Sequence, residues 1–434
     1  MTLTEDEYEA IAEVFTRIKG AVTDDTEHDD TYALKIFREA LEKPGGSIDA
    51  IGHPEVYKLD VDSVYDWPDH YDQQYGIDAS TTRSEELSNG VVLDVANAKL
   101  MTSGENGDSD VEYESTIVAS LFTEDDAFPL PTERVLREGG PIRTELYTFK
   151  ESEGRDDLKS WASSVALSLA EGYHGKRLTP VNGPLLRDGP LYPMGLVSRV
   201  VFERGDNRKG SDSYRLPDSY QMKYAKEAVQ AYIDTITKQI DVGYPVVGVT
   251  KTFITSMLID AIERKFTESD ESVPKLPWRN DYSFVSSLLY TGEPQTVTFT
   301  SWFVETYREV NNNHLEPLES FEFSGDYTPQ DFRRAFFYVR LPNDGPVFRI
   351  ETPFTVINND EEMADKIQQM VLKEVVIAND IPYVVKRADD RANITQENSE
   401  ALKSLLREQL TNDYNIHGRG KNRRYHSGGN EHHE

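Results

Sequence analysis

The stretch Leu185-Leu186-Arg187-Asp188-Gly189-Pro190 combines a short apolar run, an acid and a turn. The apolar residues predict a strand, and Asp-Gly is a common turn pair. Open α/β sheets bind their ligands at the carboxyl ends of the strands, which is where Asp188 is placed. Asp188 is therefore the first candidate for chemistry, and an aspartate that only caps the turn is the structural alternative.

Strand and helix patterns alternate on both sides of this stretch. Apolar residues at helical spacing predict helices over 156–171 and 218–241. The apolar residues 91–93, directly before Asp94, predict a strand. Further strands are expected at 115–122, 142–149, 196–202, 244–250, 296–303, 334–341, 347–351 and 383–386, and further helices at 252–266, 360–379 and 398–411. This alternation predicts an α/β domain with a mixed β-sheet flanked by helices.

The two ends of the chain differ from this central part. Residues 4–43 have a helical pattern that ends at Gly45-Gly46, and residues 51–88 are rich in Asp, Tyr and turn formers. We expect 51–88 to be irregular or weakly helical. The sequence thus predicts an N-terminal helical extension over 1–88, a main domain over 89–412 and a disordered, basic, Gly-rich tail over 413–434.

The charge of the chain is strongly negative. It has 77 acidic and 46 basic side chains, for a formal net charge of -31. Such a field repels nucleic acid at ordinary salt. However, the acids are spread along the whole chain, and the basic residues comprise 26 Arg and 20 Lys, which is typical of a halophilic protein from a very salty cytoplasm. Molar salt shortens the Debye length to roughly 3 Å. An acidic protein that avoids DNA is the alternative.

Several classes of protein are disfavoured by what the sequence lacks. It has no cysteine, which excludes disulfides, thiol nucleophiles and Cys-ligated zinc. It has no GxxxxGK[ST], HExxH or GxSxG motif, which argues against an ATPase, a zincin and an α/β-hydrolase. The N-terminus lacks a signal-like apolar stretch and no run reaches about 18 apolar residues, so a soluble cytoplasmic protein without a membrane span is expected.

A second acid also follows a predicted strand. Asp94 comes directly after Val91-Val92-Leu93. Carboxylates at strand ends, joined by a third from a nearby helix, can hold divalent ions through hard oxygen ligands. Two such ions roughly 4 Å apart activate a water and stabilise the leaving oxygen of a phosphodiester.

The segment that begins at Asp188 resembles a family motif. Asp188-Gly189-Pro190-Leu191 is similar to the Asp-Gly-(Ser/Pro)-Leu motif of the NurA nucleases, the DNA end-processing partners of the HerA hexameric ATPase. Further segments agree with the family in order and spacing. They are Val91-Val92-Leu93-Asp94, Val246-Val247-Gly248-Val249-Thr250-Lys251, the pair 337–341 and 347–351, and Ile381-Pro382-Tyr383-Val384-Val385-Lys386-Arg387-Ala388-Asp389. The resemblance covers about 90–411.

This resemblance implies an RNase H-like sheet and a two-ion site for Mn²⁺ or Mg²⁺. It also implies a homodimer that docks on a HerA-like ATPase and acts in DNA repair by end resection, as a 5′–3′ exonuclease or a single-strand endonuclease. The catalytic metal ligands implied are Asp94, Asp188, Glu171 and Asp389. Asp157 competes with Glu171 for the helix-borne position. Lys251 either contacts a DNA phosphate or ends a strand in solvent, and Glu351 is expected to be structural.

The sequence departs from the family at three places. Asp94 is followed by Val95-Ala96-Asn97 rather than by Gly-Ser, Ile381 stands where the family has Tyr, and Asp389 stands where it has His. Asp389 is still a good oxygen ligand for Mg²⁺ or Mn²⁺, but it does not supply an imidazole. The alternative is therefore a catalytically degenerate NurA-like protein that binds DNA or serves as a scaffold.

Overall fold

The structure is a computed structural model, and it describes residues 8, 12–14, 30–43, 45–82, 84–86, 92–103, 114–123, 135–150, 155–198, 220–253, 255–306, 318–358 and 360–410. The chain forms two compact units. The first unit comprises Met1–His70, Gly248–Leu315 and Gln330–Pro382, and the second comprises Tyr71–Val247, Glu316–Pro329 and Tyr383–Glu434.

The second unit contains a mixed sheet and the helices that pack on it. Its strands are β3 (Tyr75–Thr81), β4 (Glu85–Glu86), β5 (Val92–Thr102), β6 (Ser115–Thr123), β7 (Val135–Gly139), β8 (Ile142–Lys150) and β9 (Leu185–Asp188). Its helices include α4 (Arg155–Leu178), α6 (Tyr220–Asp241), α11 (Tyr383–Ala392) and α12 (Gln396–Leu410). Strand β10 (Val246–Thr250) begins in the second unit and ends in the first.

The strands of the second unit lie in the order β9-β3-β5-β6-β8-β7, with β4 beside β5. The pairs β3–β9 and β6–β8 are parallel, whereas β3–β5, β5–β6 and β7–β8 are antiparallel. Parallel neighbours need long crossover connections. Helix α4 is part of the long connection from β3 to its parallel neighbour β9.

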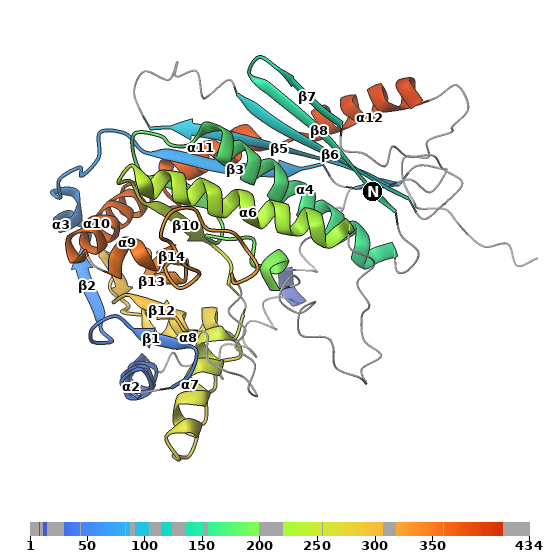
Figure 1. Ribbon diagram of the computed structural model, residues 1–434. Helices are drawn as coiled ribbons and strands as arrows, with labels where there is room; N and C mark the ends of the chain where they lie inside the picture. Colours follow the sequence, from blue (N-terminus) through green and yellow to red (C-terminus); the bar gives the residue numbers. More distant parts are fainter. Residues whose placement is uncertain are drawn as a thin grey trace, which may run out of the picture. The chain divides into compact units, whose positions relative to one another are not determined.

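Helices α4 and α6 pack against each other, and α4 covers β3, β5 and β6 (Figure 1). The buried residues of α4 include Trp161, Val165 and Leu169, spaced four apart. Residues at this spacing share one face of a helix. Helix α11 packs on β3, β5 and β9. The apolar stripe of α4 is thus what fixes this helix on the sheet.

The strands of the first unit pair mainly with one another, and the unit has its own apolar core. Its strands are β1 (Ile48–Ala50), β2 (Val56–Asp60), β11 (Thr296–Thr300), β12 (Phe303–Glu305), β13 (Arg334–Arg340) and β14 (Val347–Pro353). Its helices are α2 (Asp30–Leu41), α3 (Val61–Tyr65), α7 (Met257–Glu268), α8 (Asp281–Leu288), α9 (Phe354–Asn358) and α10 (Glu361–Ala378). The order β1-β12-β13-β14-β10 is antiparallel where pairs are described. Residues of α2, α7 and α8 share one apolar core with β12, β13 and β14.

The α/β fold with a mixed sheet and flanking helices, expected from the sequence, is confirmed. The helical pattern of 4–43 ends in α2, and residues 15–29 lie outside the described part of the chain. The expectation that 51–88 is irregular is wrong, because β2, α3, β3 and β4 lie there. Of the strand expected at 196–202, residues 196–198 are helical, and residues 199–202 lie outside the described part of the chain. The division at residue 88 and the tail from 413 stay predictions.

Among the helices that the structure describes, none combines the length and the apolar character needed to cross a membrane.

Candidate metal centre

Three aspartate side chains of the second unit converge. They are Asp78 in β3, Asp188 at the end of β9 and Asp389 in α11, and one carboxylate oxygen of each lies within 4.8 Å of those of the other two. Asp78 is buried, and the other two are partly buried. We call these three residues the carboxylate cluster. It contains two of the four predicted metal ligands and one acid that the sequence analysis missed.

Parallel pairing brings the first two acids together. Ile77 of β3 lies opposite Arg187 of β9, so the next residue of each strand is Asp78 and Asp188, respectively. Successive side chains of a strand point to opposite faces of the sheet. The two aspartates therefore share one face, and the arginine before the second of them lies on the other face.

Helix α11 covers the face that carries the aspartates. The backbone of Gly76 touches this helix so closely that a Cβ there would lie 2.1 Å from the carbonyl oxygen of Val384. Asp78 is two residues further along β3 and so faces the same helix. The close approach requires glycine, and it brings α11 near enough for Asp389 to join the cluster.

Hydrogen bonds fasten α11 to two neighbouring strands. Ser80 Oγ in β3 and Asn97 Nδ2 in β5 both donate to the carbonyl oxygen of Ala392, at 2.5 and 3.1 Å. One turn earlier, Arg387 Nη1 donates to the carbonyl oxygen of Thr102 at 2.6 Å. These bonds hold the helix against the sheet and thereby fix the third acid of the cluster.

The strand expected at 383–386 is wrong, because these residues open helix α11. The helix buries Val384, Val385, Ala388 and Ala392. This spacing places them on one helical face. Two adjacent valines at the start imitate a strand, and the later alanines are the signal that favours a helix.

The electrostatics of the cluster favour a cation. Burial, as the largest cause, and the negative charges of Glu171, Asp188 and Asp389 together raise the pKa of Asp78 to about 8. The backbone N–H of Ala79 acts in the opposite direction. Carboxylate oxygens are the ligands preferred by Mg²⁺ and Mn²⁺. The donor set and its mutual repulsion therefore fit a divalent metal ion.

The sequence contains a signal for Asp78. The segment Asp78-Ala79-Ser80 comes closer to the Asp-Gly-Ser pattern of the family than Asp94-Val95-Ala96 does. This signal is masked by the surrounding Asp and Tyr residues, because their composition predicts irregular structure rather than a strand. In the fold it lies in a central strand, in which Tyr75 through Ala79 are all buried.

Asp94 lies outside the carboxylate cluster. It is the third residue of the long strand β5 rather than the end of a strand. Its side chain is 2% exposed and accepts hydrogen bonds from Thr82 Oγ1 at 2.9 Å, Ser84 Oγ at 3.2 Å and the N–H of Val95 at 2.8 Å. Burial raises the pKa of this carboxyl, and the hydroxyl groups oppose the rise. Its described partners are those of a structural acid.

Glu171 is buried in α4, and both of its oxygens are engaged. Oε1 accepts from Arg187 Nη2 at 2.5 Å, and Oε2 accepts from Tyr232 Oη at 2.6 Å. The Arg187 guanidinium also lies over the Tyr232 ring, 3.8 Å from its centroid. Glu171 is thus outside the cluster, although its charge raises the pKa of Asp78. We call Glu171, Arg187 and Tyr232 the Glu171 triad.

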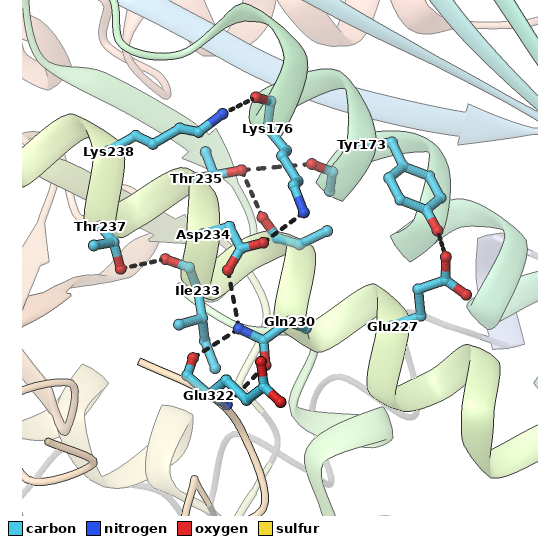
Figure 2. A network of polar contacts seen from close by, with 12 residues as sticks. Tyr173, Lys176, Glu227, Gln230, Ile233, Asp234, Thr235, Thr237, Lys238 and Glu322 are labelled. Atoms are coloured by element: carbon cyan, nitrogen blue, oxygen red, sulfur yellow. Dashed lines mark hydrogen bonds and ion pairs between the residues drawn. The ribbon is translucent and has the colours of Figure 1, made fainter. Parts of the chain in front are cut away.

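The triad depends on the contact between α4 and α6. Figure 2 shows the polar contacts along these helices: Tyr173 Oη donates to Glu227, and Lys176 Nζ lies 2.7 Å from Asp234 Oδ2. Lys238 Nζ donates to the carbonyl oxygen of Lys176 at 2.6 Å. These contacts fix the position of α6 along α4, so that Tyr232 of α6 reaches Glu171 of α4.

The other predicted site residues lie elsewhere. Asp157 is in the first turn of α4, and its side chain is outside the described part of the structure. Lys251 follows β10 in the first unit and is partly buried, and its contact with phosphate stays a prediction. Glu351 pairs with Arg334 Nη1 at 3.1 Å and Arg349 Nη2 at 2.6 Å. It is structural, as the sequence analysis expected.

The pKa of Asp78 leads to a prediction about stability without metal. In the folded state the carboxyl of Asp78 keeps its proton up to about pH 8, whereas in the unfolded chain it loses the proton near its ordinary pKa of 3.8. The free energy of unfolding should therefore fall as the pH rises through this window. Adding Mn²⁺ should raise the Tm, and more at pH 8 than at pH 6, because the ion binds the ionised carboxylates. Thermal unfolding with and without EDTA measures both effects.

The matched control is Asp78→Asn, in which the titrating carboxyl is absent. The free energy of unfolding of this variant should depend less on pH between 3.8 and about 8 than that of wild type, and Mn²⁺ should raise its Tm less. Identical pH profiles for the two proteins would contradict the assignment.

The fold and the carboxylate cluster define an α/β protein whose sheet presents a site suited to a divalent metal. A family model described as the NurA domain matches residues 167–394, just over half of the chain. The chain belongs to the NurA domain family, as the sequence resemblance indicated. The matched region includes Glu171, Asp188, Lys251 and Asp389, and it begins after Asp78.

Comparison with solved structures gives matches over most of the chain. The NurA nuclease from Sulfolobus solfataricus has 13% sequence identity and a TM-score of 0.46, covering 94% of this chain and 98% of that one. A NurA structure bound to dAMP and manganese has 11% identity and a TM-score of 0.42, covering 95% of this chain and 98% of that one. A search of curated proteins finds no match.

Proposed function

We propose that the chain is a divalent-metal-dependent DNA nuclease that hydrolyses phosphodiester bonds at the carboxylate cluster. The observation that carries the proposal is the convergence of Asp78, Asp188 and Asp389 within 4.8 Å, in a chain of the NurA domain family. Three carboxylates from two strands and a helix leave strong mutual repulsion, which a divalent cation relieves.

The cluster residues bind the metal and orient it. Asp78 and Asp188 are fixed by the backbone of paired strands, so that little conformational entropy is lost when they bind an ion. Asp389 is fixed through α11. When bound, the metal supplies Lewis-acid activation of water and neutralises charge on the phosphate. We propose Mn²⁺ or Mg²⁺, in two ions as the resemblance implies.

Glu171 lies on the face of the sheet opposite the carboxylate cluster, where it is paired with Arg187. Burial raises the pKa of its carboxyl, and the arginine and tyrosine of the Glu171 triad oppose that rise and stabilise the ionised form. Its negative charge strengthens the attraction of the cluster for a cation. Of the four acids that the resemblance implies, we propose Asp188 and Asp389 as direct ligands, Glu171 as an electrostatic support and Asp94 as a structural residue.

The finer assignments follow from the family resemblance. We propose that the protein acts on DNA ends or single strands, as a dimer, together with a HerA-type hexameric ATPase. With 77 acidic residues and a net charge of -31, it should work best at high salt. There the repulsion of DNA by the protein surface is screened beyond contact range.

Cleavage of end-labelled linear and single-stranded DNA tests this function. Wild-type protein should cleave in the presence of Mn²⁺ at high salt, and EDTA should stop it. Asp188→Ala should lose at least about a hundred-fold in rate, equivalent to about 2.7 kcal/mol, and should bind Mn²⁺ more weakly in calorimetry. The control is Asp72→Ala, an exposed acid of the same unit, which should cleave like wild type. Full activity of the Asp188 variant would overturn the proposal.

A non-catalytic protein that binds DNA or serves as a scaffold is the second candidate. The buried, apolar Ile381, which is 4% exposed, favours it, because a tyrosine is expected at this position. Asp389 in place of histidine favours it as well. Binding of Mn²⁺ without cleavage, both alone and with a co-encoded ATPase, would support this candidate over the nuclease.

A further inference from the structure

Lys99 lies beside the carboxylate cluster without belonging to it. It is the cross-strand partner of Asp78 in the β3–β5 pair. Residues directly opposite each other in such a pair share one face of the sheet. Lys99 is partly buried, and its Nζ donates to Ser115 Oγ at 2.5 Å and to the carbonyl oxygen of Glu114 at 3.1 Å. Two of its three donors are thus used by uncharged acceptors.

A second cation reaches the same place from α11. Asn97, two residues before Lys99 and on the same face of β5, holds the carbonyl oxygen of Ala392 at the end of this helix. Arg391 immediately precedes that alanine and is exposed. Two residues earlier in the helix is Asp389 of the cluster. Lys99 is thus a neighbour of a cluster acid by strand register, whereas Arg391, two residues after Asp389, points to a different side of α11.

The two positive charges repel each other. The charge of Arg391 lowers the pKa of Lys99, in addition to the larger effect of burial. The nearby carboxylate of Glu114 is already paired with Arg177 Nη2 at 3.0 Å. His174, which hydrogen-bonds Thr116 in the same region, stays uncharged because burial lowers its pKa to about 3. Neither Lys99 nor Arg391 forms an ion pair within the part of the chain that the structure describes, although Asp78 of the carboxylate cluster lies opposite Lys99 in the strand pair.

Two cations without an ion-pair partner among the described residues are unusual in a chain with a net charge of -31. Once a divalent metal neutralises the three acids of the cluster, the two cations repel each other without compensation, and an anion that joins them is favoured. The substrate of the proposed nuclease is a string of phosphates, and Lys and Arg are the side chains that bind them.

We propose that Lys99 and Arg391 form a subsite that binds a backbone phosphate of the nucleic acid strand, next to the phosphate held at the carboxylate cluster. The proposal rests on the proposed function for the identity of the ligand. The remaining N–H donor of Lys99 in β5 and the exposed guanidinium of Arg391 in α11 both donate hydrogen bonds to the phosphate. The subsite sets the position of the strand along the sheet, so that a neighbouring phosphodiester lies at the three acids.

Equilibrium binding to DNA in EDTA tests the subsite separately from cleavage. A labelled single-stranded oligothymidine of about 15 nucleotides is the probe, measured by fluorescence anisotropy between about 50 and 500 mM KCl. Lys99→Gln and Arg391→Gln should each weaken binding about three- to ten-fold at the lowest salt. Each should also reduce the slope of log K against log salt by about 0.7, the value for one phosphate of a single strand.

The controls separate charge from structure. Lys99→Arg keeps the charge and should keep the salt slope, whereas loss of binding in both Lys99 variants with a lowered Tm would mean a structural role. Lys223→Gln and Lys226→Gln remove exposed cations of α6 in the same unit that are not part of the subsite, and they should leave the slope unchanged. Competition by inorganic phosphate, and comparison of 5′-phosphorylated with 5′-hydroxyl probes, distinguish a terminal from an internal phosphate; equal affinity of the two probes supports the internal one.

Unchanged slopes in Lys99→Gln and Arg391→Gln would overturn the subsite. If wild type also cleaves DNA with Mn²⁺ in that case, the proposed function stands without it. If both variants change the slope but wild type never cleaves, the subsite stands and the nuclease proposal fails. The two proposals are thus tested by different measurements.

Discussion

Asp78→Asn is expected to abolish metal-dependent cleavage of DNA, with a loss of at least about a thousand-fold, or about 4 kcal/mol in activation free energy. Asp78 is the most buried acid of the carboxylate cluster. Water therefore has little room to replace its carboxylate as a ligand. The amide of asparagine has the same shape but no charge, so the loss reports metal binding rather than packing. Rates on labelled DNA and the affinity for Mn²⁺ measure the effect.

The matched control is Asp94→Asn, a second buried aspartate in the neighbouring strand. Its partners are hydroxyl and backbone groups, and asparagine can still accept from some of them. We expect cleavage close to that of wild type, with a loss of about 1–3 kcal/mol in stability from the donor that is left unsatisfied. The opposite pattern, with Asp94→Asn inactive and Asp78→Asn active, would restore the ligand set implied by the sequence.

Arg187→Met is expected to cause a large loss of stability. The side chain of Arg187 is fully buried and is paired with Glu171, which is 6% exposed. Removing one partner leaves a buried charge uncompensated, at a cost of about 3–5 kcal/mol. The new side chain also forfeits the stacking of the guanidinium on Tyr232. Denaturant unfolding at neutral pH measures the change in the free energy of unfolding.

The double variant Arg187→Met/Glu171→Leu separates the ion pair from the space it fills. Apolar residues of similar volume often replace a buried ion pair at little cost, so the double variant should recover much of the lost stability. Lys35→Met removes an exposed pair with Glu39, 3.7 Å apart, and should change stability little. A loss below about 1 kcal/mol in Arg187→Met would show that Glu171 does not depend on the arginine for its charge.

Local patterns predicted the helices and most of the strands correctly. The stripe at Trp161, Val165 and Leu169 predicts α4, and the apolar run before Asp188 predicts β9. These predictions succeed because side-chain periodicity is a local property of the chain. The same reasoning failed over 51–88 and at 383–386. Over 51–88 the polar composition hides strands that the fold buries. At 383–386 the adjacent Val384 and Val385 imitate a strand, although they are buried in a helix.

The candidate site could be predicted only in part. Asp188 and Asp389 were identified, whereas Asp78 was missed and Asp94 was chosen instead. Asp78 and Asp94 both lie in strands of the same sheet, and the Asp-Ala-Ser pattern at Asp78 does not by itself show which of the two meets Asp188. What distinguishes them is strand pairing, because Asp78 follows the residue that lies opposite Arg187, whereas Asp94 pairs with Ser120.

The sequence by itself determined that this is an α/β protein of the NurA family with an acid at the end of a central strand. Those properties depend on periodicity and on short motifs. Only the tertiary structure decided which acids meet, because that depends on the parallel pairing of β3 with β9 and on the docking of α11 against Gly76. It also decided that Glu171 is held by Arg187 on the opposite face of the sheet, since the alternation of side chains directs neighbouring residues to opposite faces.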